Sequence, residues 1–187
     1  MVKPPHPRDR CSAAATHGFT LAEMLIVVLI VGILAVAVVP TLGADGKKLQ
    51  VAAQEVGNTL RFALNESRRT GGFVLVDAGT SAGRVLIVNS DAAAARGTDV
   101  IDPVTKRAMD IDVASSAFSA GVTMTPKFIG PSGANAQLLI GPGPAFWAAQ
   151  GSAVMGSLQP GSGVDLRLGN ETLTVGFDSV TGRVVIP

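Results

Sequence analysis

The sequence predicts an α+β protein in which a long N-terminal helix, half membrane-type and half amphipathic, packs on an antiparallel β-sandwich or sheet. Three features support this: an apolar run near the N-terminus, an amphipathic stretch after it, and many short strand-like segments in the rest of the 187-residue chain. Hydrophobic residues make up 47% of the chain and charged residues only 16%. We therefore divide the chain into residues 1–18, 19–40, 41–71 and 72–187.

The first 18 residues are polar and basic. Lys3, Arg8 and Arg10 outnumber Asp9, and three prolines disfavour a helix. The single cysteine, Cys11, also lies here, so no intrachain disulfide can form. Basic residues before an apolar span stay on the cytoplasmic side. We expect a single-pass inner-membrane protein with a cytoplasmic N-terminus and a periplasmic C-terminal domain.

Residues 19–39 form an apolar run, FTLAEMLIVVLIVGILAVAVV, in which Glu23 is the only charged residue. As a helix it covers roughly 31 Å, enough to cross a hydrocarbon core of about 30 Å. We predict a transmembrane helix over 19–40. The alternative is a secretory signal that is cleaved after Pro40, where small residues follow. Glu23 argues against it, because an acid in lipid is costly and needs a functional reason.

An amphipathic helix is predicted next, over residues 47–69. Apolar side chains recur at spacings of three and four and mark one face. Arg68 and Arg69 suit the negative end of the helix dipole, and Gly71 and Gly72 end the helix. The residues of the apolar face are Leu49, Ala53, Val56, Leu60 and Leu64.

Short strands separated by turn residues are predicted from residue 72 onward. Residues 168–172 and 178–182 are typical of hairpin connections. This pattern predicts antiparallel sheets packed on the preceding helix. The predicted strands are 73–77, 84–89, 109–113, 122–129, 137–140, 164–168, 172–177 and 183–186.

The residues Gly18-Phe19-Thr20-Leu21-Ala22-Glu23, followed by a long apolar stretch, resemble the prepilin cleavage and methylation motif. The resemblance implies that a prepilin peptidase cuts after Gly18 and N-methylates Phe19. It also implies that Glu23 acts in filament assembly. The new Phe19 amine is cationic at neutral pH, and Glu23 lies one helical turn further on. In lipid these two charges are costly apart and much less costly together.

Two later segments resemble the GspH/FimT family. Residues 60–69 with 71–76 are similar to that family's helix end and first strand, but Ala-Leu-Asn-Glu-Ser stands where Ala-Arg-x-Glu-Ala is usual, so Leu64 and Ser67 depart from the pattern. Residues 175–184 are similar to its closing hairpin, with Ser179 where proline is common. The implied protein is an H-type minor pseudopilin of a type II secretion system. Its partners would be other pseudopilins and an inner-membrane assembly platform.

Two other functions remain open. A minor pilin of a type IV pilus, of the FimT type that takes part in assembly or DNA uptake, would share the same N-terminus. DNA binding would need a basic patch, but the net charge is +1 and acids flank Arg167 and Arg183. An anchored enzyme is disfavoured, because His6, His17 and Cys11 all precede the cleavage site, so common His- or Cys-based catalytic sets are missing.

Two further clusters lie in the C-terminal part. Asp99, Asp102, Asp110 and Asp112 could hold calcium, but their spacing matches no known loop, and a solvated loop explains them as well. We assign no metal and no cofactor. The aromatic pair 146–147 is expected either in the core or as a contact for another subunit.

Overall fold

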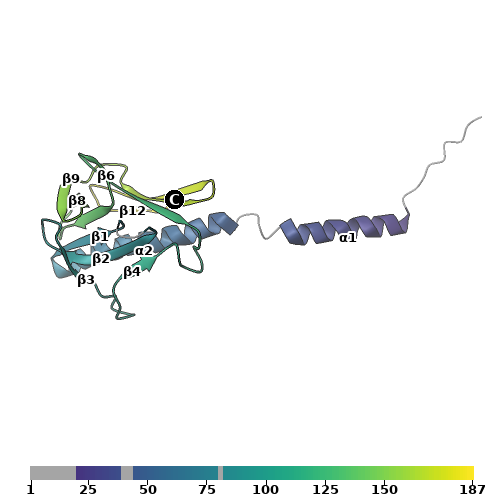
Figure 1. Ribbon diagram of the computed structural model, residues 1–187, viewed down its shortest axis with the longest axis horizontal. Helices are drawn as coiled ribbons and strands as arrows, with labels where there is room; N and C mark the ends of the chain where they lie inside the picture. The colour runs from purple at the N-terminus through teal and green to yellow at the C-terminus, as the bar shows by residue number, and fades with distance from the viewer. Residues whose placement is uncertain (1–19, 39–43, 80–81) are drawn as a thin grey trace, which may run out of the picture. The chain divides into compact units, whose positions relative to one another are not determined.

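The computed structural model describes residues 20–38, 44–79 and 82–187. The chain divides into two units, Met1–Leu42 and Gly43–Pro187 (Figure 1), and each is described by itself. The predicted leader 1–18 and Phe19 lie outside the described residues. So do residues 39 and 40, at the end of the predicted apolar helix.

The first unit contains one described helix, α1, over Leu21–Val38. Its sequence, LAEMLIVVLIVGILAVAV, has one acid in the first turn and is apolar on every side. Leu21 is 83% exposed and Val28 70% exposed. Among the described residues, no helix combines the length and the apolar character that crossing a membrane requires.

The second unit begins with α2, over Ala44–Thr70. This helix starts three residues before the predicted one and ends one residue after it. Gly71, with a φ of +66°, donates its N–H to the Ser67 carbonyl and ends the helix. The predicted apolar face is confirmed, because all five of its residues are buried: Leu49, Ala53, Val56, Leu60 and Leu64.

Two antiparallel sheets follow. A seven-stranded sheet has the order β3-β2-β1-β7-β8-β9, with β4 also paired to β2. A five-stranded sheet has the order β12-β11-β10-β5-β6. The first comprises β1 (Phe73–Asp77), β2 (Arg84–Ser90), β3 (Arg96–Asp99), β4 (Asp110–Asp112), β7 (Gln137–Ile140), β8 (Phe146–Gln150) and β9 (Ala153–Ser157). The second comprises β5 (Thr123–Gly130), β6 (Gly133–Asn135), β10 (Gly163–Leu168), β11 (Glu171–Phe177) and β12 (Val184–Val185).

The main core lies where α2 and both sheets meet. Figure 1 shows α2 running along the sheets, and it contacts β1 of the first sheet and β10, β11 and β12 of the second. Buried side chains from all three layers form one cluster, which includes Leu60, Ile140 and Phe177. The α+β architecture is therefore confirmed, with a helix packed on antiparallel sheets.

A second, smaller core lies on the opposite face of the seven-stranded sheet. Val74 and Val76 belong to the main core, whereas Leu75 between them belongs to the smaller one. Successive strand residues point to opposite faces, which explains the division. Ala94, in the connection from β2 to β3, joins this smaller core and is fully buried. The connection therefore covers part of the outer face.

The predicted strands agree with the observed ones to within two residues at each end. Four short strands were not predicted: β3, β6, β8 and β9. β3 is exposed along its length, and β6 and β9 contain glycine, so these three strands show no alternation of apolar and polar side chains. In β8, Phe146 is buried and contacts the ring of Phe177 edge-on at 5.1 Å, while Trp147 lies half-buried on the other face beside Phe73.

Candidate functional site

The predicted processing site is only partly within the described residues. Gly18 and Phe19 lie outside them, whereas Thr20 and Glu23 are described. Thr20 immediately precedes α1, and Glu23 is in its first turn. The geometry at the start of α1 is therefore described from Thr20 and Glu23.

Thr20 and Glu23 form a reciprocal capping box. The Thr20 N–H donates to Glu23 Oε2 at 2.9 Å, and the Thr20 hydroxyl donates to the same oxygen at 3.0 Å. In return, the Glu23 N–H donates to Thr20 Oγ1 at 3.2 Å. Two backbone donors that a helix start leaves unsatisfied thereby gain partners. The Glu23 side chain is thus folded back toward the N-terminus instead of extending along the helix.

Thr20 is the residue that the sequence interpretation missed. The resemblance includes Thr20 without a role of its own, although Thr-x-x-Glu before an apolar run is itself the sequence signature of a capping box. That signature predicts the contact without any family knowledge. Thr20 therefore has a physical role, which is to hold the Glu23 carboxylate at the start of the helix.

The four aspartates considered for calcium do not converge. Asp110 pairs with Arg84, and Arg96 Nη2 lies 3.6 Å from Asp99 Oδ1. Asp102 and Asp112 each cap a turn. No group of three or more possible metal-ligating His, Cys, Asp or Glu side chains occurs in the described ranges.

The charged side chains of this region instead form hydrogen bonds and ion pairs with nearby residues. The Thr105 hydroxyl, 2.7 Å from Asp102 Oδ2, and the Val104 N–H lower the pKa of Asp102. The paired Asp110 carboxylate raises the pKa of Arg84 above its usual range. These are turn and cross-strand contacts.

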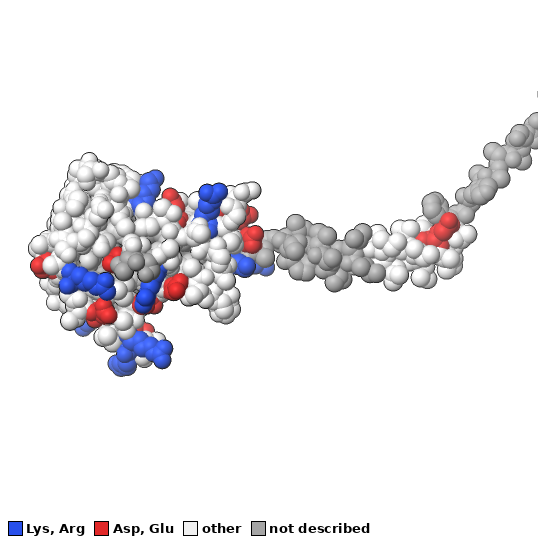
Figure 2. Space-filling view, in the orientation of Figure 1, with Lys and Arg blue, Asp and Glu red and all other residues white. Residues whose placement is uncertain are grey.

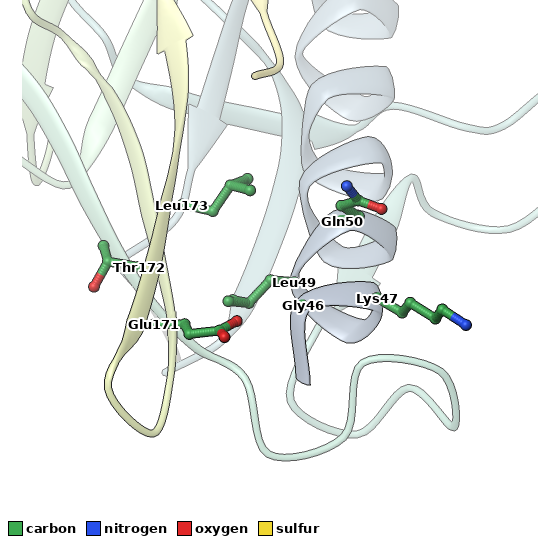
Figure 3. A pocket seen from close by; sticks show the side chains of 7 residues that line it. All are labelled: Gly46, Lys47, Leu49, Gln50, Glu171, Thr172 and Leu173. Atoms are coloured by element: carbon green, nitrogen blue, oxygen red, sulfur yellow. The ribbon is translucent and has the colours of Figure 1, made fainter. Parts of the chain in front are cut away.

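A hollow of about 480 Å³ lies between the start of α2 and β11. In Figure 3, Leu49 and Leu173 lie between the helix and the strand, Glu171 lies beside the helix start, and Lys47 extends away. The residues that line it include no His or Cys. Its polar lining side chains are Lys47, Gln50, Glu171 and Thr172.

On the face of the domain shown in Figure 2, the charged side chains are dispersed. Figure 2 shows Lys and Arg at several separate positions on the viewed face, with Asp and Glu among them. Near the C-terminus, the Arg167 guanidinium donates to the Gly169 carbonyl, and Arg183 is followed by the apolar β12. This face does not present the continuous basic stripe that binding to a nucleic-acid backbone requires.

Comparison with known proteins identifies the N-terminal segment. The model of the prokaryotic N-terminal methylation motif matches residues 14–39. The chain carries a prepilin-like N-terminus. The match includes Gly18, Phe19, Thr20 and Glu23, and it indicates a membrane-anchored N-terminal segment.

No curated protein matches the chain. Among solved structures, the crystal structure of the type IV minor pilin FimU from Pseudomonas aeruginosa strain PAO1 is similar, with 17% sequence identity and a TM-score of 0.39. That similarity covers 74% of this chain and 87% of the FimU chain.

Proposed function

We propose that this chain is a type IV pilin-like structural subunit that assembles into a filament through its N-terminal helix. The observation that carries the proposal is the methylation motif at residues 14–39, which combines the Thr20–Glu23 capping box with an apolar helix. The role is structural, not catalytic.

The chemistry of processing follows from the position of these residues. Cleavage after Gly18 by a prepilin peptidase leaves an amine on Phe19, which is cationic at neutral pH with or without a methyl group. Glu23 Oε2 accepts from the N–H of Thr20, the residue after Phe19. The carboxylate therefore contacts the residue that directly follows the one carrying the new amine. It can neutralise that amine on its own chain or on a neighbouring subunit, which lowers the cost of both charges in lipid.

The apolar helix supplies the second part of the mechanism. Residues 19–40 form the transmembrane segment in this proposal, with the N-terminus in the cytoplasm and the domain in the periplasm. α1 is apolar on every side, so it can pack against several neighbours at once. Subunits leave the inner membrane by exchanging lipid contacts for contacts with other helices, on an inner-membrane assembly platform.

We assign the subunit more finely as an H-type minor pseudopilin of a type II secretion system, which assists protein export across the outer membrane. The support is the resemblance of residues 60–76 and 175–184 to the GspH/FimT family. The first segment corresponds to the end of α2 and β1, and the second to the β11–β12 hairpin.

The N-terminus of the mature protein tests the proposal. Intact mass and N-terminal peptide mass spectrometry of protein from its native membrane should give a chain that starts at N-methylated Phe19. A chain that starts after Pro40 would indicate a secreted domain, and one that still starts at Met1 would indicate an unprocessed anchor. Either result would overturn the proposal.

Deletion of the gene tests the finer assignment. We expect the proteins that the type II system secretes to remain in the periplasm, while surface pili and DNA uptake are unchanged. Expression of the full-length chain should restore secretion. Loss of pili or of DNA uptake with normal secretion would assign the subunit to a type IV pilus instead.

A further inference from the structure

The loop between β4 and β5 exposes an aromatic side chain among uncharged neighbours. This loop, residues 114–121, reads ASSAFSAG, and the chain carries no charged residue over 113–126. Phe118 is 73% exposed, and Ala117 and Ala120 beside it are also exposed. All other aromatic side chains that the structure describes are buried or half-buried. Phe118 is therefore the exception among the described aromatic residues.

Internal hydrogen bonds hold this loop in shape. Asp112 Oδ1 accepts from the first two N–H groups of the loop, both at 3.1 Å. The Ser119 N–H donates to the Ser116 carbonyl at 3.2 Å, and the buried Ser119 hydroxyl donates to the Val113 carbonyl at 2.8 Å. Polar groups with partners inside the protein lose little when a loop enters a region poor in water. The loop can therefore present Phe118 to an apolar environment at low cost.

The loop lies at the end of the domain where α2 begins. A Cβ on Gly121 would lie 3.5 Å from Leu168 Cδ1. Leu168 pairs with Glu171 across the β10–β11 hairpin. Glu171 and Gly46 in turn line the same hollow at the start of α2 (Figure 3). The loop, the hairpin turn and the first turn of α2 thus belong to one end of the domain.

The covalent chain ties this end of the domain to the proposed membrane segment. That segment ends at residue 40, and α2 begins at Ala44. Four residues of chain reach at most about 14 Å. The start of α2 therefore stays within that distance of the end of the membrane segment, which puts the loop within reach of the lipid surface.

The charged side chains near the start of α2 offset one another. Lys47 and Lys48 are matched in number by Asp45 and Glu171. Attraction to anionic lipid headgroups is therefore weak at this end, and an apolar contact has to supply the affinity for a membrane.

We propose that loop 114–121 rests on the inner membrane, with the Phe118 ring inserted at the boundary between lipid headgroups and acyl chains. This inference rests on the proposed membrane anchor at residues 19–40. Insertion is favourable because the apolar area of the ring leaves water. Phe118 gives the domain a second contact with the bilayer, and this contact is lost when the subunit leaves the membrane for a filament.

Tryptophan fluorescence in phosphatidylcholine vesicles tests this inference. Trp147→Phe removes the native tryptophan from the full-length chain, and Phe118→Trp then places a single one in the loop. Lipids brominated on their acyl chains quench a tryptophan that contacts them. We expect the Phe118→Trp emission to shift to the blue and to lose most of its intensity with brominated lipid. Added salt should not reverse the quenching, because the contact is apolar and salt screens only charges.

Val180→Trp in the same background is the matched control. Val180 is 72% exposed and lies in the β11–β12 turn, which packs beside Leu64 in the second half of α2. It should not be quenched. Equal quenching of Val180→Trp and Phe118→Trp would overturn the proposal. So would a blue-shifted Phe118→Trp emission that brominated lipid leaves unchanged, because a second protein chain would then cover the loop.

Ile30→Trp, in α1, separates failure of this inference from failure of the proposed anchor. If Ile30→Trp is quenched and Phe118→Trp is not, the anchor stands and the membrane contact of the loop is wrong. If neither is quenched, the proposed membrane anchor is wrong as well.

Discussion

Gly182, in the turn between β11 and β12, has a φ of +71°. A Cβ at this position would lie 2.5 Å from Phe146 Cζ and 3.2 Å from Leu64 Cδ2. We expect Gly182→Ala to lower the free energy of unfolding by about 2–4 kcal/mol, because left-handed backbone strain and overpacking add together. Denaturant unfolding of the full-length chain in detergent measures this. Gly143→Ala is the control, since a Cβ there meets nothing within 4 Å, and an equal loss in both variants would contradict the prediction.

Asp178 makes the same turn sensitive to acid. Its Oδ1 accepts from the N–H groups of Val180 and Thr181 and from the Thr181 hydroxyl, and these bonds lower the pKa of Asp178. A carboxylate with a lowered folded-state pKa contributes stability above its unfolded pKa of about 3.9, and this is lost as pH falls through the folded value.

We therefore expect Asp178→Asn to destabilise the protein at pH 7 and to destabilise it less at pH 3. Unfolding midpoints of both chains at the two pH values provide the measurement. Ser179→Ala in the same turn is the control, because its effect should not depend on pH. An equal effect of Asp178→Asn at both pH values would show that the charge of Asp178 contributes nothing.

At the scale of elements, Ser67 links the end of α2 to the residue before β1 and to the end of β7. It is fully buried, and its hydroxyl lies 2.7 Å from the Gly72 carbonyl and 3.3 Å from the Ile140 carbonyl. Ser67→Ala should cost about 1–2 kcal/mol, because a buried hydrogen bond is lost and its acceptors are left with fewer partners. Arg68→Ala, at the exposed neighbouring position, is the matched control for helix propensity. Hydrogen exchange of β1 and β7 amides should rise in Ser67→Ala alone, and unchanged protection would contradict this role.

The helix α2 and most strands could be predicted because their apolar side chains repeat at the helical or strand period. β8 could not, since Phe146 and Trp147 are adjacent apolar residues that face opposite sides of one sheet. β3 is exposed throughout and has no alternation to detect. In the candidate site, the role of Glu23 is implied by the resemblance to the prepilin motif and by the cost of an acid in lipid, whereas its contact with Thr20 needed the capping-box signature. The pairing that places Asp77 opposite Gln137 depends on contacts about sixty residues apart, and no local pattern encodes it.

At the scale of the whole molecule, assembly should depend on Glu23. In Glu23→Gln the Phe19 amine has no opposing carboxylate in the apolar environment, so we expect incorporation to fall by roughly a hundredfold. The variant should still be cleaved after Gly18, since the motif around the scissile bond is intact. The amount of variant in sheared filaments, compared with that in the membrane fraction, measures this.

Glu171→Gln removes an exposed carboxylate of the domain and is the control, because it should assemble as the wild type does. Normal incorporation of Glu23→Gln would show that the charge of Glu23 is not needed for assembly.

Trp147 is the only tryptophan of the chain, and it lies half-buried beside Phe73 in the smaller core, away from α2. Its fluorescence therefore reports on the outer layer of the seven-stranded sheet, while circular dichroism in the far ultraviolet reports mainly on the helices. A change in fluorescence alone indicates that the outer face of the seven-stranded sheet has lost its packing, whereas a change in both signals indicates that the whole domain has unfolded. The protein thus carries a built-in optical probe that requires no label.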